Sequence, residues 1–267
     1  MTVKHIAIYC VNYHSYDSLE KYLQSIDRAV EKSQEPLTLS VFVADNSVPC
    51  TPVGYEPRHF SLRVLPTGEN KGYFGAIQYL MRQMSPLEYD YCIVSNVDVL
   101  LDDAFFTNLC TCEPDEMVGW IAPEIYSRIE RRDRNPKILQ RYPRRKLQIL
   151  KTLFRIPPLY NLYTHTVYKS KKLLHHEAGP IYAGHGSFII LTQQYFRLCG
   201  IIDYPVFLFC EEIYLGEQCR LHQLKVIYDP TIRVTDAEHA STSTIRRSKY
   251  CEYNFQAISH ILETYYK

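Results

Sequence analysis

The sequence predicts a single α/β domain built on a mostly parallel β-sheet. Two observations carry this prediction. Short apolar runs alternate with helical patterns along the first third of the chain, and the length of 267 residues suits one large core. The composition, 46% hydrophobic and 22% charged, is that of an ordinary globular protein, and it excludes collagen-like, coiled-coil and disordered classes.

The first third of the chain supplies the parallel part of the expected sheet. A bounded apolar run at residues 6–11 predicts the first strand, and apolar side chains then recur at helical spacing from Leu19 to Ile26. Strand–helix–strand repetition implies a sheet covered by helices on both faces, with ligands beyond the carboxyl ends of the strands. Further strands are expected at residues 39–43, 62–65 and 91–95, and a helix at residues 76–84.

Polar residues follow four of these strands at the point where each strand ends. Turn formation accounts for each case separately, because Asn, Asp, Ser and Gly are common turn residues, but it does not account for the repetition. The sequence therefore predicts a polar rim at one edge of the sheet. The four segments are Asn12-Tyr13, Asp45-Asn46-Ser47, Glu69-Asn70-Lys71-Gly72 and Asn96-Val97-Asp98.

The second half of the chain begins with a basic segment and then resumes the sheet. Between Arg128 and Lys172 there are 14 Lys/Arg and two acidic residues, a net charge of +12, while the remainder of the chain carries −11. The formal total of +1 therefore conceals an acidic body with a basic insert. Beyond it we expect strands at 187–191, 226–228 and 232–234, and helices at 193–198, 211–222 and 248–266.

The cysteines and apolar runs indicate a cytoplasmic protein. The nine cysteines are scattered without paired C-x-x-C spacing, so neither a zinc site nor a disulfide framework is expected. No stretch approaches the ~20 apolar residues of a membrane span, and the N-terminal run lacks the features of a signal peptide. Any membrane contact is therefore expected to be peripheral, on the inner face of the cytoplasmic membrane.

Taken in order, the polar motifs resemble those of family-2 inverting glycosyltransferases with the GT-A fold, particularly the rhamnosyltransferase-like branch of bacterial polysaccharide biosynthesis. The matching stretches lie within residues 5–125 and 181–245: VNYHSYDSLEKYLQSI, VADNS, ENKGYFGA, SNVDVLL, GSFIILTQQYF and FLFCEEIYLGEQCRLHQLKVIYDP, followed by residues 236–243. The resemblance implies one GT-A domain over 1–267. Its parts are a nucleotide-binding half (1–125), a basic helical insert (126–178), an acceptor and catalytic half (179–245) and a C-terminal helix (246–267).

The resemblance implies that a nucleotide sugar binds at the ends of the early strands. A carboxylate such as Asp45 can accept a hydrogen bond from a pyrimidine ring N–H, although Asp45 could instead form an Asx turn. In the N-x-G motif a small residue lets the helix N-terminus approach the nucleotide, although Gly72 could also be a plain helix-start glycine. The residues implied are Asn12, Tyr13, Asp45, Asn70, Gly72, Asn96, His185 and Gly186.

A divalent cation, Mg²⁺ or Mn²⁺, is implied by the segment that occupies the place of the family's D-x-D motif. Hard oxygen ligands suit both ions, and Asp98 is the expected ligand because Asn96 replaces the first carboxylate. In the family's late metal-binding stretch a His commonly comes first. Here Asp236 stands at that place and His239 follows three residues later, so either residue is a candidate ligand.

Glu211 and Glu212 match the family's E-D pair at the start of a helix, and the resemblance implies that one of them is the catalytic base. Inverting transfer needs a carboxylate to accept the proton of the acceptor hydroxyl. By position Glu212 matches the base and Glu211 would orient hydroxyl groups, but the reverse assignment stays open. Two acids in a first helical turn also stabilise the helix dipole without any catalysis.

The implied activity is metal-dependent, inverting transfer of a hexose or deoxyhexose from a nucleoside-diphosphate sugar to an acceptor hydroxyl. The acceptor expected is a lipid-linked or growing surface polysaccharide (capsule, O-antigen or lipopolysaccharide). The interleaved basic and apolar residues of 128–172 suit an anionic membrane surface, and no nucleic-acid partner is expected. The alternative is an inactive sugar-nucleotide-binding or scaffold protein, because Asn96, Glu212 and Asp236 depart from the family pattern.

Overall fold

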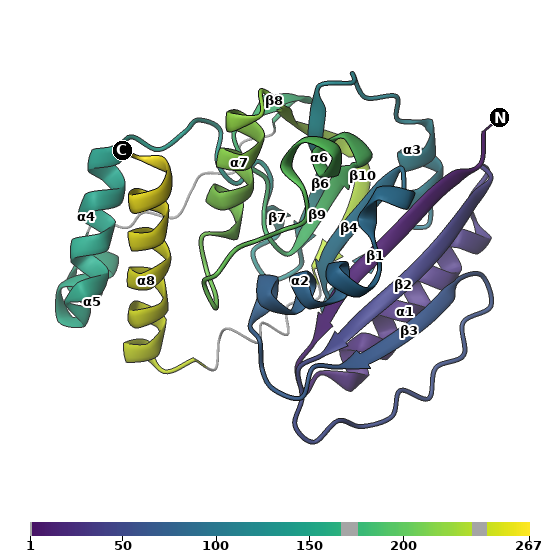
Figure 1. The fold of residues 1–267 in the computed structure, drawn as a ribbon, viewed down its shortest axis with the longest axis horizontal. Helices are drawn as coiled ribbons and strands as arrows, with labels where there is room; N and C mark the ends of the chain where they lie inside the picture. The colour runs from purple at the N-terminus through teal and green to yellow at the C-terminus, as the bar shows by residue number, and fades with distance from the viewer. Residues whose placement is uncertain (1, 167–175, 237–244) are drawn as a thin grey trace.

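The computed structural model describes residues 2–166, 176–236 and 245–267, and in this part of the chain ten strands form one sheet (Figure 1). The strand order is β3-β2-β1-β4-β9-β6-β10-β5, with β7 beside β6 and β8 beside β10. The strands are β1 (Lys4–Asn12), β2 (Leu37–Asp45), β3 (Ser61–Pro66), β4 (Tyr91–Asn96), β5 (Val99–Leu101), β6 (Val118–Ser127), β7 (Arg132–Asp133), β8 (Gly179–Ile181), β9 (Phe188–Thr192) and β10 (Lys225–Asp236). The predicted α/β fold class is confirmed.

Helices cover both faces of the sheet. Successive residues of β1 and β2 are buried on opposite faces, as expected for strands between two helical layers. Helices α1 and α3 pack on one face, whereas α2, α6 and α7 pack on the other. The helices are α1 (Tyr16–Glu31), α2 (Tyr73–Gln83), α3 (Phe105–Thr111), α4 (Arg144–Arg155), α5 (Pro157–Thr166), α6 (Gln193–Cys199), α7 (Glu211–Leu221) and α8 (Arg247–Tyr265).

The parallel half of the sheet brings the polar strand ends level with one another. Strands β3, β2, β1 and β4 are parallel neighbours, and Asn12 at the end of β1 pairs in register with Asp45 at the end of β2. On the other side of β1, Val11 pairs with Asn96 at the end of β4. The predicted polar rim is therefore a continuous edge of the structure.

The other half of the sheet is mixed, and its last long strand differs from the sequence prediction. Strand β9 runs antiparallel to both β4 and β6. The two strands expected at 226–228 and 232–234 are one strand, β10, so that prediction is wrong. A register irregularity lies between Asp229 and Arg233, around Pro230, because proline cannot donate to a strand ladder. Three residues at the end of β10 pair with β5 and continue the sheet.

Helices α4, α5 and α8 form a group beside α7, at the opposite side of the molecule from β1, β2 and β3 (Figure 1). A buried ion-pair network fastens this group to α7. The fully buried carboxylate of Glu217 accepts hydrogen bonds from Arg141 Nε at 2.5 Å, Arg220 Nε at 2.7 Å and the Tyr182 hydroxyl at 2.7 Å. Arg141 also donates to the carbonyl of Tyr265 near the end of α8. No described helix combines the length and apolar character that crossing a bilayer requires.

The N-terminus of α2 lies against the loop that precedes α7, and Gly72 makes this approach possible. Gly72 has a φ of +72°, and a Cβ atom placed on it would lie 2.1 Å from the carbonyl oxygen of Phe207. The amide of Tyr73 donates to the same carbonyl at 3.3 Å. A side chain at position 72 would therefore displace backbone that leads directly into α7.

We expect Gly72→Ala to lower the free energy of unfolding by about 2–4 kcal/mol, because it adds a backbone clash to an unfavourable φ. Urea denaturation measures the effect. Gly54→Ala is the matched control, since a Cβ at Gly54 meets no atom within 4 Å and no positive φ is involved. Equal stability of the Gly72 variant and the control would contradict the close approach.

Candidate active site

Asn12 and Asp45 form the innermost part of the rim, and both side chains are almost fully buried. Asn12 Nδ2 donates to Asp45 Oδ1 at 3.1 Å, and the amide of Ser47 donates to the same oxygen. The Tyr16 hydroxyl donates to Asp45 Oδ2 at 2.8 Å. A carboxylate offers about four lone-pair directions, and these donors occupy three of them. Tyr13, beside this cluster, is 45% exposed.

A second cluster joins the end of β2 to the start of α2. Asn46 Nδ2 donates to the carbonyl of Gly72 at 2.9 Å and to Asn70 Oδ1 at 3.2 Å. The amide of Gly72 donates to the same Asn70 oxygen. The predicted residues Asn70 and Gly72 are thus bound together at the N-terminus of α2, where backbone N–H groups favour an anionic ligand.

Glu211 and Glu212 begin α7, but their carboxyl groups lie in different environments. Glu211 is buried and accepts a hydrogen bond from the amide of Phe209 at 2.8 Å. Burial, and then the negative charge of Glu212, raise the pKa of Glu211 to about 8. Glu212 is less buried, and its Oε1 accepts from the amide of Gly186 at 3.2 Å. The burial of Glu211 therefore favours the protonated form of its carboxyl group.

The backbone before this pair is strained. Phe209 and Cys210 have φ values of +75° and +63°, in the left-handed region that residues other than glycine rarely adopt. Such residues cost on the order of 1–3 kcal/mol each and persist where the surroundings fix them. Here the Tyr204 hydroxyl donates to the carbonyl of Phe209, and the Glu211 carboxyl accepts from its amide. The positive φ values of Phe209 and Cys210 turn the chain so that the first turn of α7 faces the Gly186 loop.

Tyr73, the first residue of α2, lies between the glutamate pair and the end of β4. Its hydroxyl donates to the carbonyl of Gly186 at 2.8 Å, so Tyr73 and Glu212 bind the two sides of the same glycine. Burial raises the pKa of Tyr73 well above its usual value, and the charges of Glu211, Asp98 and Glu212 raise it further. The structure thus brings the predicted base and the predicted metal ligand close to one side chain.

The segment Asn96-Val97-Asp98 connects β4 to β5 next to the same loop. The amide of Asn96 donates to the carbonyl of Ser187 at 3.0 Å. Asp98 is partly exposed, and the adjoining residue Val99 pairs in register with Asp236 of β10. Asp98 and Asp236, distant in the sequence, therefore lie at neighbouring positions of the sheet edge.

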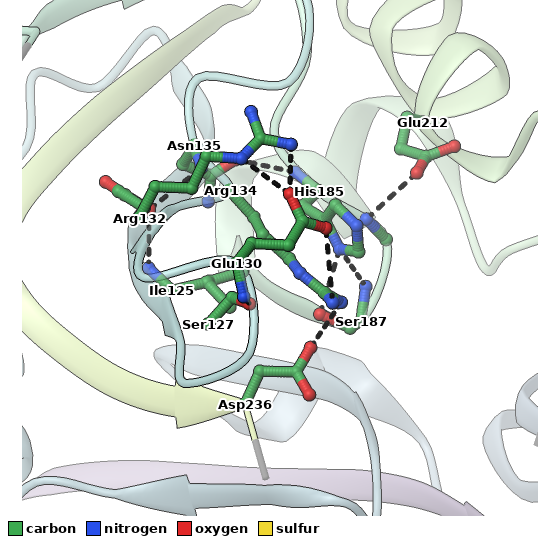
Figure 2. Close-up of polar contacts among 12 residues, drawn as sticks. Ile125, Ser127, Glu130, Arg132, Arg134, Asn135, His185, Ser187, Glu212 and Asp236 are labelled. Carbon is green, nitrogen blue, oxygen red and sulfur yellow. Dashed lines mark hydrogen bonds and ion pairs between the residues drawn. The ribbon is translucent and has the colours of Figure 1, made fainter. Parts of the chain in front are cut away.

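Asp236 has a cationic side chain as its partner. It is 3% exposed and accepts from Arg134 Nη1 at 2.5 Å, while Arg134 Nη2 lies 3.7 Å from Glu130. Figure 2 shows the Arg134 guanidinium between Glu130 and Asp236, with His185 and Ser187 beside it. Asp236 can bind a metal ion only if this pair opens, because the guanidinium already occupies one carboxylate oxygen. His239 lies outside the described residues.

His185 lies beside Arg134 in the site (Figure 2). Its backbone amide donates to Asn135 Oδ1 at 2.7 Å, and its Nδ1 lies 2.9 Å from Ser187 Oγ. Burial, and then the positive charges of Lys137 and Arg134, lower the pKa of His185 well below its usual value. The imidazole is therefore neutral at pH 7 and contributes hydrogen bonds to the loop that carries Gly186.

The described carboxylate ligands suit a cation that binds together with a diphosphate. Among residues 2–166, 176–236 and 245–267, no group of three His, Cys, Asp or Glu side chains could hold a metal ion. A Mg²⁺ ion, however, commonly takes only one or two protein carboxylates, and phosphate oxygens and water complete its shell. Asp98 satisfies that requirement, so the residues suit a metal–nucleotide complex better than a metal bound to the protein alone.

Two residues of the site were not predicted as site residues from the sequence. Tyr73 lies within the ENKGYFGA motif, so its position after Gly72 was a usable signal. Arg134 was counted only as part of the basic insert. Its pairing with Asp236 joins positions 102 residues apart, and no local pattern predicts such a contact.

Comparison with known proteins finds glycosyltransferases, both by sequence and by fold. No protein-family model matches the chain. Two N-acetylglucosaminyl-diphospho-decaprenol L-rhamnosyltransferases of Mycobacterium tuberculosis, from strains CDC 1551 / Oshkosh and ATCC 25618 / H37Rv, are each 26% identical over 255 residues. The match covers 89% of this chain and 77% of each relative.

Solved structures share the fold at much lower identity. A mannosyltransferase from Pyrobaculum calidifontis, in complex with GDP-Man and Mn²⁺, matches 91% of this chain with a TM-score of 0.55 and 12% identity. The chain spans 60% of the length of that mannosyltransferase. Staphylococcus aureus TarS matches 97% of this chain with a TM-score of 0.56 and 7% identity, and 44% of TarS is covered. The resemblance stated from the motifs is confirmed: the chain is similar in sequence to rhamnosyltransferases and has the fold of solved glycosyltransferases.

Proposed function

We propose that this protein transfers a sugar from a nucleoside-diphosphate donor to an acceptor hydroxyl, with inversion at the anomeric carbon and with the help of a divalent cation. The observation that carries the proposal is the unequal glutamate pair at the start of α7. One carboxyl is buried, which raises its pKa, whereas its neighbour is less buried and reaches the Gly186 loop. The pair lies near Asp98 across Tyr73.

Glu212 is the base in this proposal. A general base must be ionised and within reach of the proton that it accepts. Glu211 suits the first condition less well, because its burial raises its pKa and favours the protonated form. Glu212 then accepts the proton of the acceptor hydroxyl as the oxygen forms its bond to the anomeric carbon. Glu211 orients hydroxyl groups as a donor.

The leaving diphosphate departs on the side of Asp98. A Mg²⁺ or Mn²⁺ ion bound there supplies positive charge that stabilises the phosphate oxygens. Asp98 would hold the ion, and Asp236 or His239 would be the further ligand. Arg134 lies close by and binds Asp236 in the structure, so it keeps that carboxylate neutralised when no ion is present.

The nucleotide part of the donor belongs at the rim in this proposal. Asn12, Tyr13 and Asp45 would contact the base and ribose, and the partly exposed Tyr13 ring offers an apolar face for stacking. Asn70, Gly72 and Asn96 would border the phosphates beside the N-terminus of α2. His185 and Gly186 would border the sugar. The donor class agrees with the GDP-Man bound by the mannosyltransferase relative.

The acceptor proposed is a lipid-linked saccharide. The two curated relatives are named for L-rhamnosyl transfer with a decaprenol diphosphate carrying N-acetylglucosamine. We therefore propose a hexose or deoxyhexose donor and a growing surface polysaccharide as the product.

A scaffold protein on the same fold is the second candidate, because Asn96 replaces one carboxylate of the D-x-D motif. Donor hydrolysis distinguishes the two, since a scaffold does not release sugar.

Two substitutions separate the two halves of the mechanism. Glu212→Gln keeps size and hydrogen bonding but removes the base, so we expect transfer to fall by about 10²–10⁴-fold while metal-dependent nucleotide binding survives.

Asp98→Ala is expected to lose the Mn²⁺-dependent part of nucleotide binding. Isothermal titration with nucleoside diphosphates and a transfer assay measure both effects. Normal turnover by Glu212→Gln, or unchanged Mn²⁺ dependence in Asp98→Ala, would contradict the roles assigned.

The raised pKa of Glu211 predicts a particular dependence of stability on pH. The folded state keeps this proton up to about pH 8, whereas an unfolded Glu loses it near its usual pKa of 4.5. The folded state therefore binds more protons between these values, and its stability falls as pH rises through this window. Glu211→Gln removes the penalty, so its stability relative to the wild type should rise by more than about 1 kcal/mol from pH 5 to pH 8. Urea denaturation at both pH values checks this, and a constant difference would refute the buried, protonated state.

A further inference from the structure

The basic insert divides into three parts with different environments. Arg132 and Arg134 belong to the hairpin of β6 and β7 and pair with acidic side chains near the active site. Arg141 is held in the buried ion pair with Glu217. The remaining basic residues of the described insert that lie on a helix are on α4, at the outer side of the molecule (Figure 1).

Helices α4 and α5 expose large apolar side chains among these basic residues. Ile149 is 60% exposed and Leu162 is 59% exposed, although the opposite side of α4 is buried through Leu147 and Phe154. Ile156 and Leu159 add two further exposed apolar side chains between them. We call these exposed side chains, together with those of the basic residues of α4, the α4–α5 surface; it consists of Arg145, Ile149, Arg155, Ile156, Leu159 and Leu162.

The charge of this surface has one sign. Residues 144–166 contain five Lys/Arg and no acidic residue. The nearest acids of α8 are engaged with lysines: Glu263 lies 3.8 Å from Lys151, and Glu252 lies 2.9 Å from Lys249. The surface therefore offers positive charge to a partner outside the molecule.

Aromatic contacts connect the α4–α5 surface to the loop before the glutamate pair. The ring of Tyr160 in α5 lies 4.5 Å from Phe154 of α4 and 6.1 Å from Tyr250 of α8. Tyr250 in turn contacts Phe209, with ring centroids 5.0 Å apart. The amide of Phe209 donates to the carboxyl group of Glu211. A series of three aromatic side chains, Tyr160, Tyr250 and Phe209, therefore runs from α5 to the turn before the glutamate pair.

We propose that the α4–α5 surface binds the face of an anionic lipid bilayer. Basic residues next to an anionic membrane are attracted to its surface, and exposed isoleucine and leucine side chains gain by entering the boundary between headgroups and acyl chains. The orientation rests on the proposed function, because it would present a lipid-linked acceptor to Glu212. The binding itself is a property of the surface alone.

The pattern favours a bilayer over other partners. A nucleic acid would neutralise the charge but leave Ile149 and Leu162 in water. A second copy of this chain would bring two surfaces of the same positive sign together, which repel each other. A bilayer with anionic lipids would remove the apolar side chains from water and would also neutralise the charge of the basic side chains.

The test is co-sedimentation of the full chain with vesicles of phosphatidylglycerol and phosphatidylcholine, compared with phosphatidylcholine alone, without donor or acceptor. We expect binding to the anionic vesicles that weakens as salt is added. The fourfold variant Arg145→Gln, Ile149→Ser, Arg155→Gln, Leu162→Ser should partition at least about tenfold more weakly, because it loses both charge and apolar contact.

A matched control removes the same kinds of side chain elsewhere. Arg63→Gln, Arg82→Gln, Leu87→Ser, Leu221→Ser changes two exposed arginines and two leucines that are 50% and 53% exposed, outside the α4–α5 surface. It should bind vesicles like the wild type. Equal vesicle binding by the two fourfold variants would overturn the proposal, and so would a wild-type protein that does not bind vesicles. A wild-type protein that is a dimer, and becomes a monomer only in the surface variant, would also overturn it.

Transfer assays separate this proposal from the proposed function. The surface variant should keep wild-type transfer to a short water-soluble acceptor and lose it selectively for an acceptor embedded in vesicles. Loss with both acceptors would show a role in folding or catalysis and overturn the membrane role. Vesicle binding by a wild-type protein that transfers no sugar would refute the proposed function alone.

Discussion

The buried carboxylate of Glu217 is the interaction on which the arrangement of the second half depends. Burial by itself would raise the pKa of Glu217, but hydrogen bonds from Arg141, Tyr182 and Arg220 outweigh it and hold the pKa below the usual value. Removing one partner of such a buried pair typically costs about 3–5 kcal/mol, because the remaining charge has no compensation. This network fixes α7 to the segment that leads into α4. Arg141 extends it to the end of α8 through the carbonyl of Tyr265.

The opposite end of α7 carries the two glutamates proposed for catalysis. With its C-terminal half fixed at Glu217, the helix presents Glu211 and Glu212 after a turn strained at Cys210. The amide of Tyr73 donates to the carbonyl of Phe207 and so ties the loop before that turn to α2. The same helix group bears the α4–α5 surface. A single connection therefore links three features: the proposed base, the proposed acceptor side and the surface proposed for the membrane.

The parts predicted correctly from the sequence depend on local pattern. Alternating strands and helices determine a parallel sheet, and parallel strands end at one edge, so Asn12, Asp45 and Asn96 could be placed together from their positions alone. Long-range partners could not be placed. The pair of Arg134 and Asp236 has no signal in local periodicity, and β5, with three residues, exists only because β10 pairs with it. In the sequence, Pro230 made β10 look like two strands, because a proline at a bulge and a proline at a strand end interrupt the apolar pattern in the same way.

The central claim is that one glutamate acts as a base and no side chain of the protein becomes bonded to the sugar. The most direct measurement is the anomeric configuration of the first-formed product, determined by NMR and compared with that of the donor. The account predicts the opposite configuration, because a single displacement inverts the anomeric carbon. A product with the donor's configuration would contradict it, since retention requires either two displacements or attack from the face of the leaving group.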